Sequence, residues 1–135
     1  MRRYLLDTGM AGDYINRRNN VFARARAEVA RGNRIGICVP VLGELYFGIE
    51  WSATRDRNLQ RLRQALPAWT LWPFNEAAAA EFGRLAAELR RAGRSIQQID
   101  IQIAAIALSL GNCTVVSGDS DLAAVPGLAV ENWAS

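Results

Sequence analysis

Short apolar segments alternate with segments of helical periodicity along most of the chain. Five segments are typical of strands and cover residues 3–7, 34–39, 69–73, 114–117 and 128–131. The predicted helices cover residues 21–31, 40–51, 54–66, 75–92 and 96–110. Strands that alternate with helices form parallel sheets that are covered on both faces. We therefore expect an α/β fold, a three-layer α/β/α sandwich with a central parallel sheet of four to five strands.

The chain has the features of one compact domain. Its 135 residues contain no repeat, low-complexity segment or linker, so we expect a single domain over residues 1–135. No apolar run reaches the roughly 18–20 residues of a membrane span, and the segment before Asp7 is too short for a signal peptide. We therefore expect no membrane association and a cytoplasmic location. Cys38 falls in a predicted strand and Cys113 directly precedes one, and at such positions small core residues are more common than an intracellular disulfide.

The charged residues restrict the chemistry that the chain can perform. All sixteen cationic residues are Arg, and the chain has neither Lys nor His. Without His, the chain has no Ser-His-Asp or Cys-His catalysis and no imidazole-bound zinc. It also lacks the usual general base of metal-free ribonucleases. Without Lys, P-loop and Schiff-base chemistry are excluded. The groups left for catalysis are mainly carboxylates, hydroxyls, thiols and arginine.

Three long segments each contain a single charged residue, and that residue is an acid. Asp7 stands alone in residues 4–12, Glu44 in residues 35–49 and Asp100 in residues 95–118, and Asp119 and Asp121 follow directly. None of the sixteen Arg lies inside these segments. An ionised carboxylate among apolar side chains costs several kcal/mol unless another group compensates it.

Each acid taken alone also has a structural interpretation. Asp7 could cap a following helix, and Glu44 could stabilise the N-terminus of its own helix. Asp119 and Asp121 could belong to a turn after a strand. Asp100 has no arginine three or four residues away, so a local ion pair is excluded.

Taken together, the positions favour a common site. Asp7 and Asp119 end two apolar strands, while Glu44 and Asp100 lie near the starts of the two most apolar helices. In a parallel sheet, strand C-termini and helix N-termini share one edge, where ligands bind. Two carboxylates about 5 Å apart repel by about 3 kcal/mol at an effective dielectric constant near 20. Four of them need a cation, and an oxygen-only site suits Mg²⁺ or Mn²⁺ and the hydrolysis of phosphodiesters.

The remaining charge favours a polyanionic partner. The net charge is +3, so the chain carries +8 outside the five acids of the predicted site. The arginines cluster at positions 17–18, 24–34, 55–63 and 84–94. Most of them are expected to form a solvated surface. A basic surface around an acidic site also suits a nuclease, which must hold phosphates while it retains its metal.

The sequence resembles the PIN-domain ribonucleases, and within them the VapC-type toxins of bacterial toxin–antitoxin modules. The resemblance covers essentially the whole chain. It rests on Tyr4-Leu5-Leu6-Asp7-Thr8, on Gly43-Glu44-Leu45 followed by Gly48, on Asp100 before the apolar residues 103–107, on Val-Val-Ser-Gly-Asp-Ser-Asp at 115–121, and on Val-Pro-Gly-Leu at 125–128 before Glu131-Asn132-Trp133. Each motif alone is weak, but their order and spacing are specific.

The resemblance implies an Mg²⁺- or Mn²⁺-dependent endoribonuclease that forms homodimers and is inhibited by a cognate antitoxin. It implies that Asp7, Glu44, Asp100 and Asp119 bind metal, with Asp121 as a variable fifth acid. The antitoxin would contact the helices around residues 44–66, and its tail would cover the active site. The resemblance also implies an RNA substrate, with tRNA as one candidate.

The chain departs from the family pattern at three positions. Gly9 replaces the Asn that commonly follows Asp-Thr, which removes a polar group near Asp7 while Thr8 is kept. Ser117 replaces the commoner Thr and keeps the hydroxyl as a supporting group. Leu122 replaces a frequent Phe, which changes packing.

Two alternatives keep part of this interpretation. A metal-dependent DNA nuclease, either a 5′-nuclease relative or a Toprim-like enzyme, would share the acidic site. Toprim enzymes place a Glu where this chain has Asp7, and flap-type nucleases usually carry longer insertions than this chain can hold. A non-catalytic PIN-like binding module would not need the full set of acids.

Overall fold

The strands form one five-stranded sheet in which all neighbouring strands are parallel, in the order β3-β2-β1-β4-β5. The computed structural model describes residues 1–135. In chain order its elements are β1 (Arg3–Leu6), α1 (Thr8–Asn16), α2 (Val21–Ala30), β2 (Arg34–Cys38), α3 (Val39–Trp51), α4 (Arg55–Ala65), a 3₁₀ turn (Leu66–Ala68), β3 (Thr70–Trp72), α5 (Glu76–Arg91), α6 (Gln98–Leu110), β4 (Cys113–Val116), α7 (Ser120–Ala123) and β5 (Ala129–Glu131). The predicted parallel α/β/α architecture is confirmed.

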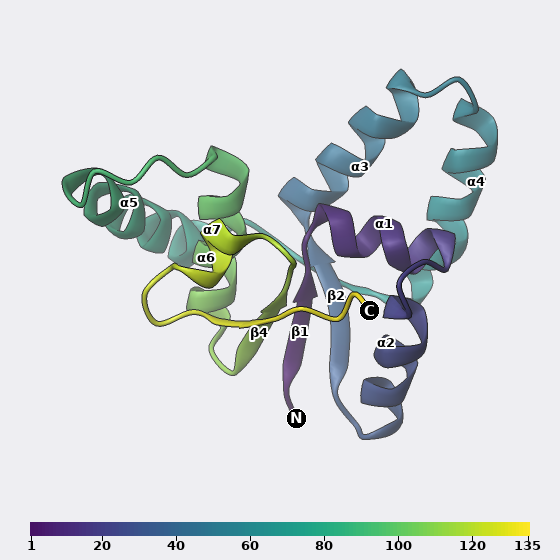
Figure 1. Ribbon diagram of the computed structural model, residues 1–135, viewed down its shortest axis with the longest axis horizontal. Helices are drawn as coiled ribbons and strands as arrows, with labels where there is room; N and C mark the ends of the chain where they lie inside the picture. The colour runs from purple at the N-terminus through teal and green to yellow at the C-terminus, as the bar shows by residue number, and fades with distance from the viewer.

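The helices cover both faces of the sheet and extend beyond its carboxyl edge. Helices α1 and α2 lie on one side of the strands, and α5, α6 and α7 lie on the other (Figure 1). Helices α3 and α4 contact each other as a pair that projects beyond the carboxyl ends of the strands. None of the helices has both the length and the apolar character that crossing a membrane requires.

The centre of the sheet supplies the core. Leu5, Leu6, Val115 and Val116 are fully buried in the adjacent strands β1 and β4. A Cβ atom on Gly36 of β2 would lie 2.0 Å from the carbonyl oxygen of Thr70, so only glycine fits beside β3.

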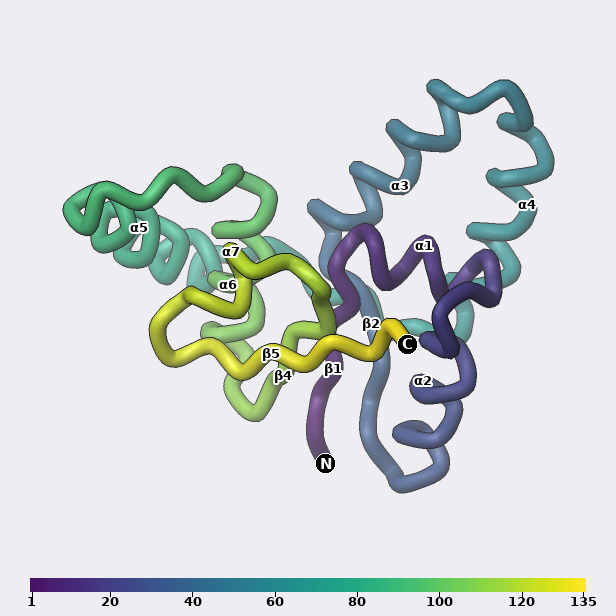
Figure 2. The backbone as a smooth tube through the Cα atoms, viewed as in Figure 1, coloured from purple at the N-terminus to yellow at the C-terminus, as the bar shows by residue number.

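The C-terminal segment, which follows β5, crosses in front of β1 toward the loop between α1 and α2 (Figure 2). The Trp133 ring lies 5.0 Å from the Tyr4 ring, and the Ser135 amide donates to the Asn19 carbonyl at 3.2 Å. These two contacts hold the segment that follows β5 against β1 and against the loop between α1 and α2.

Of the two helix caps predicted at Thr54 and Asn75, the structure contains one, and both cysteines are free thiols. Asn75 caps α5 by accepting a hydrogen bond from the Ala78 amide at 3.0 Å, as predicted. Thr54 precedes α4 as predicted, but its side chain makes no capping bond and instead accepts a hydrogen bond from Asn58. Cys38 lies in β2 and Cys113 begins β4, and both are free thiols. Burial raises the pKa of Cys38 to about 11 and that of Cys113 to about 12, so both stay protonated.

Helices α1 and α7 had no predicted counterpart. Helix α1 contains Gly9 and Gly12, which weaken the helical signal, and α7 has only 4 residues. Each of these helices begins directly after an acid of the predicted site, Asp7 in one case and Asp119 in the other.

Candidate active site

Asp7 lies at the carboxyl end of β1, where the strand passes into α1. Its Oδ1 atom accepts a hydrogen bond from the Met10 amide at 2.8 Å and caps the helix. The helix-capping interpretation of Asp7 is therefore correct for one carboxylate oxygen. A capping bond uses one of two oxygens, so it does not prevent the other from binding a ligand.

Asp119 follows β4 after Ser117 and Gly118 and, like Asp7, precedes a helix. Its Oδ1 atom accepts a hydrogen bond from the Asp121 amide at 2.8 Å, so Asp119 caps the short helix α7. The predicted turn chemistry of this segment is therefore present. Strands β1 and β4 are neighbours with Leu6 opposite Val116, which brings the segments that follow these strands to the same place on the sheet edge.

Ser117 connects these two acids. The residue is almost completely buried, and its Oγ atom accepts a hydrogen bond from the Asp119 amide at 2.9 Å. Burial raises the pKa of Asp7, and a hydrogen bond with the Ser117 side chain opposes this effect. The hydroxyl therefore interacts with Asp7 at one strand end and with the backbone of Asp119 at the other.

Glu44 reaches the site from α3. It is exposed and lies beyond the first turn of that helix, which begins at Val39, so the predicted role at the helix N-terminus is not supported. Its Oε1 atom accepts a hydrogen bond from the Thr8 hydroxyl at 2.5 Å. This bond links α3 to the start of α1, next to Asp7.

Asp100 lies in the first turn of α6 and is partly buried. Its pKa is raised to about 6, first because burial disfavours the charged form and then because of the negative charges of Asp119, Asp7, Glu44 and Asp121. Asp100 is therefore close enough to all four other acids to be affected by their charges. This convergence agrees with the placement expected from the strand and helix ends.

The five acids have no arginine partner. The eight salt bridges of the structure instead involve six other acids, which are Glu28, Glu50, Asp56, Glu81, Glu88 and Glu131. In a chain with sixteen arginines, the absence of partners leaves a region of uncompensated negative charge. Such a region is a place where a cation binds favourably.

The donor chemistry fits a hard divalent cation. The side chains available are carboxylates and the hydroxyls of Thr8 and Ser117, and oxygen donors are the ligands that Mg²⁺ and Mn²⁺ prefer. No three of the chain's Cys, Asp and Glu side chains lie close enough together to hold one ion in the present arrangement. The carboxylates are thus close enough to affect one another's charge, but they are not arranged to coordinate one ion together.

The three departures from the family pattern have different surroundings. A Cβ atom on Gly9 would lie 3.7 Å from the Oδ1 atom of Asp7, an ordinary contact, so a side chain fits there. Leu122 is completely buried and attaches α7 to the core. Ser117 supplies the hydroxyl that a Thr would supply.

Two features of the structure were not predicted, one near these acids and one at the opposite edge of the sheet. A cavity of about 230 Å³ is lined by Thr8 and Glu44 together with Asn16, Asn58 and Arg61. No local sequence signal marks Arg61, because Arg57 and Arg63 on the same helix also lack an acid three or four residues away. The second feature is Glu28, an acid with 2% exposure that was expected only as part of a helix. Its pKa is lowered despite burial, because Asn33, Arg31 and Arg24 stabilise the charged form.

Comparison with known proteins gives a consistent result. A PIN-domain family model matches residues 4–128. The ribonuclease VapC2 of Haemophilus influenzae is 32% identical over 136 residues, which cover 98% of this chain and 99% of that protein. The tRNA(fMet)-specific endonuclease VapC of Shigella flexneri is 29% identical and covers 98% of this chain and 99% of its own length.

Solved structures show the same similarity. The structure of VapBC2 from Rickettsia felis, bound to a promoter DNA fragment, matches with a TM-score of 0.90 and 28% identity, over 97% of this chain and 98% of that chain. DNA-bound VapBC from Salmonella typhimurium matches with a TM-score of 0.88 and 27% identity, over 98% of this chain and 99% of that chain. The similarity therefore extends over the entire sheet and both helical layers.

Proposed function

The chain belongs to the PIN-domain family, and from this premise we propose that it is a metal-dependent endoribonuclease, the toxin of a toxin–antitoxin pair. The observation that carries the proposal is the set of five acids without arginine partners at one edge of the sheet, where burial and the charges of the other four acids raise the pKa of Asp100. The names of the relatives support RNA as the substrate, and one relative is specific for tRNA(fMet).

The proposed metal ligands are Asp7, Glu44, Asp100 and Asp119, with Asp121 as a supporting acid. A divalent cation bound there, Mg²⁺ or Mn²⁺, supplies a Lewis acid that activates water and stabilises the leaving oxygen. Binding of the cation would also remove the mutual repulsion that now raises the pKa of Asp100.

The chain's own hydroxyls would hold the carboxylates in place. Ser117 bonds to the backbone of Asp119 and interacts with Asp7, while Thr8 donates to Glu44. These contacts restrain three of the four proposed ligands, and such supporting partners orient metal ligands in other proteins. Asp100 is carried by the first turn of α6, which is anchored by the buried Ile101 and Ile103.

The proposal predicts the chemistry of the products. Incubation of the purified chain with RNA and Mg²⁺ or Mn²⁺ should give 5′-phosphate and 3′-hydroxyl ends, because water rather than the 2′-hydroxyl attacks. Sequencing the 5′ ends of cleaved RNA, with Asp7→Ala as the control, identifies the cut site. Cleavage that survives chelation, or that leaves 2′,3′-cyclic phosphate, contradicts the proposal.

The same assay separates the alternatives. Preferential cleavage of DNA in a parallel incubation would favour the DNA nuclease. Calorimetry that detects no Mn²⁺ binding, together with no cleavage, would favour the non-catalytic binding module.

We propose a cognate antitoxin as the protein partner, because the matching structures include, besides the two VapBC structures above, VapBC-5 from Mycobacterium tuberculosis, a member of the VapBC family of toxin–antitoxin systems. The contact would lie on α3 and α4. On α3, Phe47 is 70% exposed and Trp51 is 84% exposed, and their rings stack with centroids 6.5 Å apart. Large exposed apolar side chains on one helix are typical of an interaction surface. A homodimer, which the family resemblance implies, stays a prediction.

A further inference from the structure

We infer that Arg61 on α4 binds a phosphate of the RNA strand next to the scissile bond, and that the groove between α1 and α4 guides this strand away from the acids. The inference rests on the proposed ribonuclease function and adds a substrate-positioning residue to it. Four features of the structure support it: the continuity of two cavities, the balance of charge, the surroundings of Arg61 and the reach of α1.

Two cavities adjoin each other along α1. The first, of about 230 Å³, is lined by Thr8 and Glu44 and also by Ile15 and Arg61. The second, of about 500 Å³, is lined by Ile15 and Arg61 as well, and extends along α2 as far as Val29. Because Ile15 and Arg61 line both, the two cavities meet at these residues, and together they are here called the α1–α4 groove, which contains Glu44 at one end.

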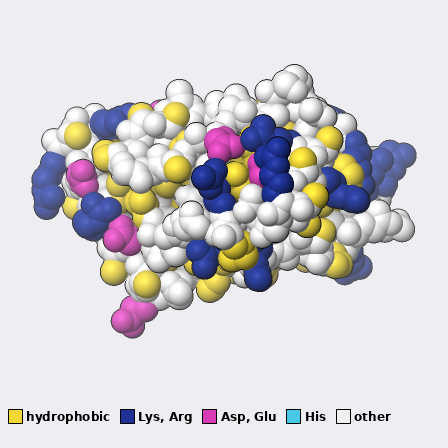
Figure 3. Space-filling model, turned by 90° about the horizontal axis from the view of Figure 1, so that it is seen from below, with side chains coloured by type: hydrophobic (Ala, Val, Ile, Leu, Met, Phe, Trp, Pro, Cys, Tyr) yellow, Lys and Arg dark blue, Asp and Glu magenta, His cyan; other side chains and the backbone are white.

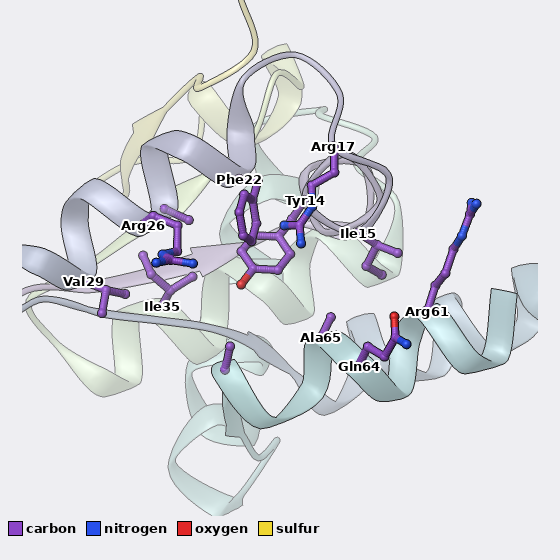
Figure 4. Close-up of a pocket in the computed structure, with 12 residues that line it drawn as sticks. Tyr14, Ile15, Arg17, Phe22, Arg26, Val29, Ile35, Arg61, Gln64 and Ala65 are labelled. Atoms are coloured by element: carbon purple, nitrogen blue, oxygen red, sulfur yellow. The ribbon is translucent and has the colours of Figure 1, made fainter. Parts of the chain in front are cut away.

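The far part of the α1–α4 groove carries only positive charge. Its charged lining residues are Arg17, Arg26 and Arg61, and no Asp or Glu lines it. Arg26 and Arg61 lie at opposite sides of the cavity, with Tyr14 and Phe22 between them (Figure 4). The Arg17 guanidinium lies 3.2 Å from the centre of the Phe22 ring. Most of the lining is apolar, but every charged side chain in it is cationic, and cations beside aromatic side chains are a usual surface for single-stranded nucleic acid.

The arginines at the opposite edge of the sheet have a different environment. Acidic side chains lie among arginines on the face that includes the amino ends of the strands (Figure 3). There, Arg2, Arg24 and Arg31 form salt bridges with Glu28 or Glu131. Arg61 forms no salt bridge, and its one polar side-chain partner is the Oδ1 atom of Asn16 at 3.3 Å. Its remaining donors are therefore free to bind a phosphate.

The length of α1 sets the reach of the groove. The helix has 9 residues, which at a rise of 1.5 Å per residue corresponds to about 14 Å. It begins beside Asp7 and Glu44 and ends at Arg17. A short stretch of single-stranded RNA whose scissile phosphate lies at the acids can therefore extend along α1 to the arginines.

The test compares Arg61→Ala with Arg63→Ala by fluorescence anisotropy of a labelled, unstructured RNA oligonucleotide. Asp7→Asn in both proteins and in the reference keeps the RNA uncut, and Asn retains a side chain that can cap α1. Arg63 is exposed on the same helix but lines neither cavity, so its variant controls for lost charge and helix propensity.

Arg61→Ala should weaken RNA binding about tenfold at low salt, as expected for one charge-assisted hydrogen bond. It should also reduce the slope of the logarithm of the binding constant against the logarithm of salt concentration by about 0.7. Arg61→Lys should keep this slope, because Lys keeps the charge. Arg63→Ala should bind RNA nearly as the reference does. Thermal melts should show that all variants are folded.

Equal losses in Arg61→Ala and Arg63→Ala would overturn the inference, because the effect would then reflect overall charge. Unchanged RNA binding by Arg61→Ala would overturn it as well, and if antitoxin binding were lost instead, the groove would be a protein-binding site. Neither result affects the proposed ribonuclease, since RNA cleavage by the chain without these substitutions is measured separately. A reference protein that binds no RNA would argue against both.

Discussion

Asp100 differs from an ordinary surface acid because its pKa is raised to about 6 by burial and by four neighbouring carboxylates. The folded state therefore holds the proton more tightly than the unfolded state, where the pKa is close to 3.8. Stability without metal should fall as the pH rises between these two values and should stay lower above pH 6. This behaviour belongs to one residue, so a single substitution tests it.

Asp100→Asn should abolish RNA cleavage and raise metal-free stability at pH 7. The gain should be about 1 kcal/mol, a value reduced for solvent screening because the carboxyl group is only partly buried. Urea unfolding in chelator at pH 4 and pH 7 measures it, and the gain should vanish at pH 4, where the native carboxyl is already protonated.

Asp56→Asn is the matched control, because Asp56 is exposed and paired with Arg55 outside the site. Strong destabilisation by Asp100→Asn at both pH values would instead identify Asp100 as a structural hydrogen-bonding residue.

At the scale of secondary structure, α7 depends on the tertiary fold. A helix of 4 residues is not stable alone, because helix nucleation is costly. Two contacts hold it: the cap by Asp119 and the completely buried side chain of Leu122. Since Asp119 caps α7 and Asp121 lies in its first turn, the position of these acids depends on the same two contacts.

Leu122→Ala should reduce the free energy of unfolding by about 3 kcal/mol, the typical cost of such a truncation in a core. It should also reduce cleavage by more than the unfolded fraction explains, because Asp119 and Asp121 lose their support. Leu122→Met nearly conserves volume and should cost less than about 1.5 kcal/mol. Denaturant unfolding and cleavage rates measured on the same samples test this link. A normal cleavage rate in folded Leu122→Ala would show that α7 does not position the acids.

The secondary structure could be predicted where the pattern was long. Helices α5 and α6 have 16 and 13 residues, and the prediction located both to within a few residues. Helices α1 and α7 were missed because two glycines weaken the first and the second is too short for a periodic pattern. In both cases the acid in front of the helix was identified although the helix was not.

At the scale of the whole molecule, the pair of α3 and α4 projects beyond the sheet (Figure 1). Helix α3 of this pair carries exposed aromatic side chains. Tyr46, Phe47 and Trp51 remain 39%, 70% and 84% exposed. Nothing within the chain covers them, which agrees with the proposed antitoxin contact on this pair.

The double substitution Phe47→Ser and Trp51→Ser should abolish binding of the co-expressed antitoxin and leave the free energy of unfolding of the chain nearly unchanged. The reason is that exposed side chains contribute little to the chain's own stability. Size-exclusion chromatography and calorimetry of the complex measure the effect. Leu71→Ser, at an exposed position of β3 that lines neither cavity of the α1–α4 groove, is the control. A complex of normal affinity would place the antitoxin elsewhere.

The sequence by itself determined the architecture and the identity of the candidate acids. Alternating apolar strands and periodic helices are local patterns, and such patterns predict a parallel sheet. The same topology brings strand ends and helix starts to one edge of the sheet. Asp7, Glu44, Asp100 and Asp119 could therefore be assigned to one site from the sequence alone. The sequence also shows directly that no arginine lies in the segments around Asp7, Glu44 and Asp100.

Only the tertiary structure decided how each charge is compensated. Glu28 is an acid buried among arginines, and Asp100 is an acid without them, although both lie on helices. Arg61 and Arg63 are two residues apart on one helix, yet only Arg61 lines the α1–α4 groove. Electrostatic energies depend on distance and burial in three dimensions, and segments far apart in the sequence set both.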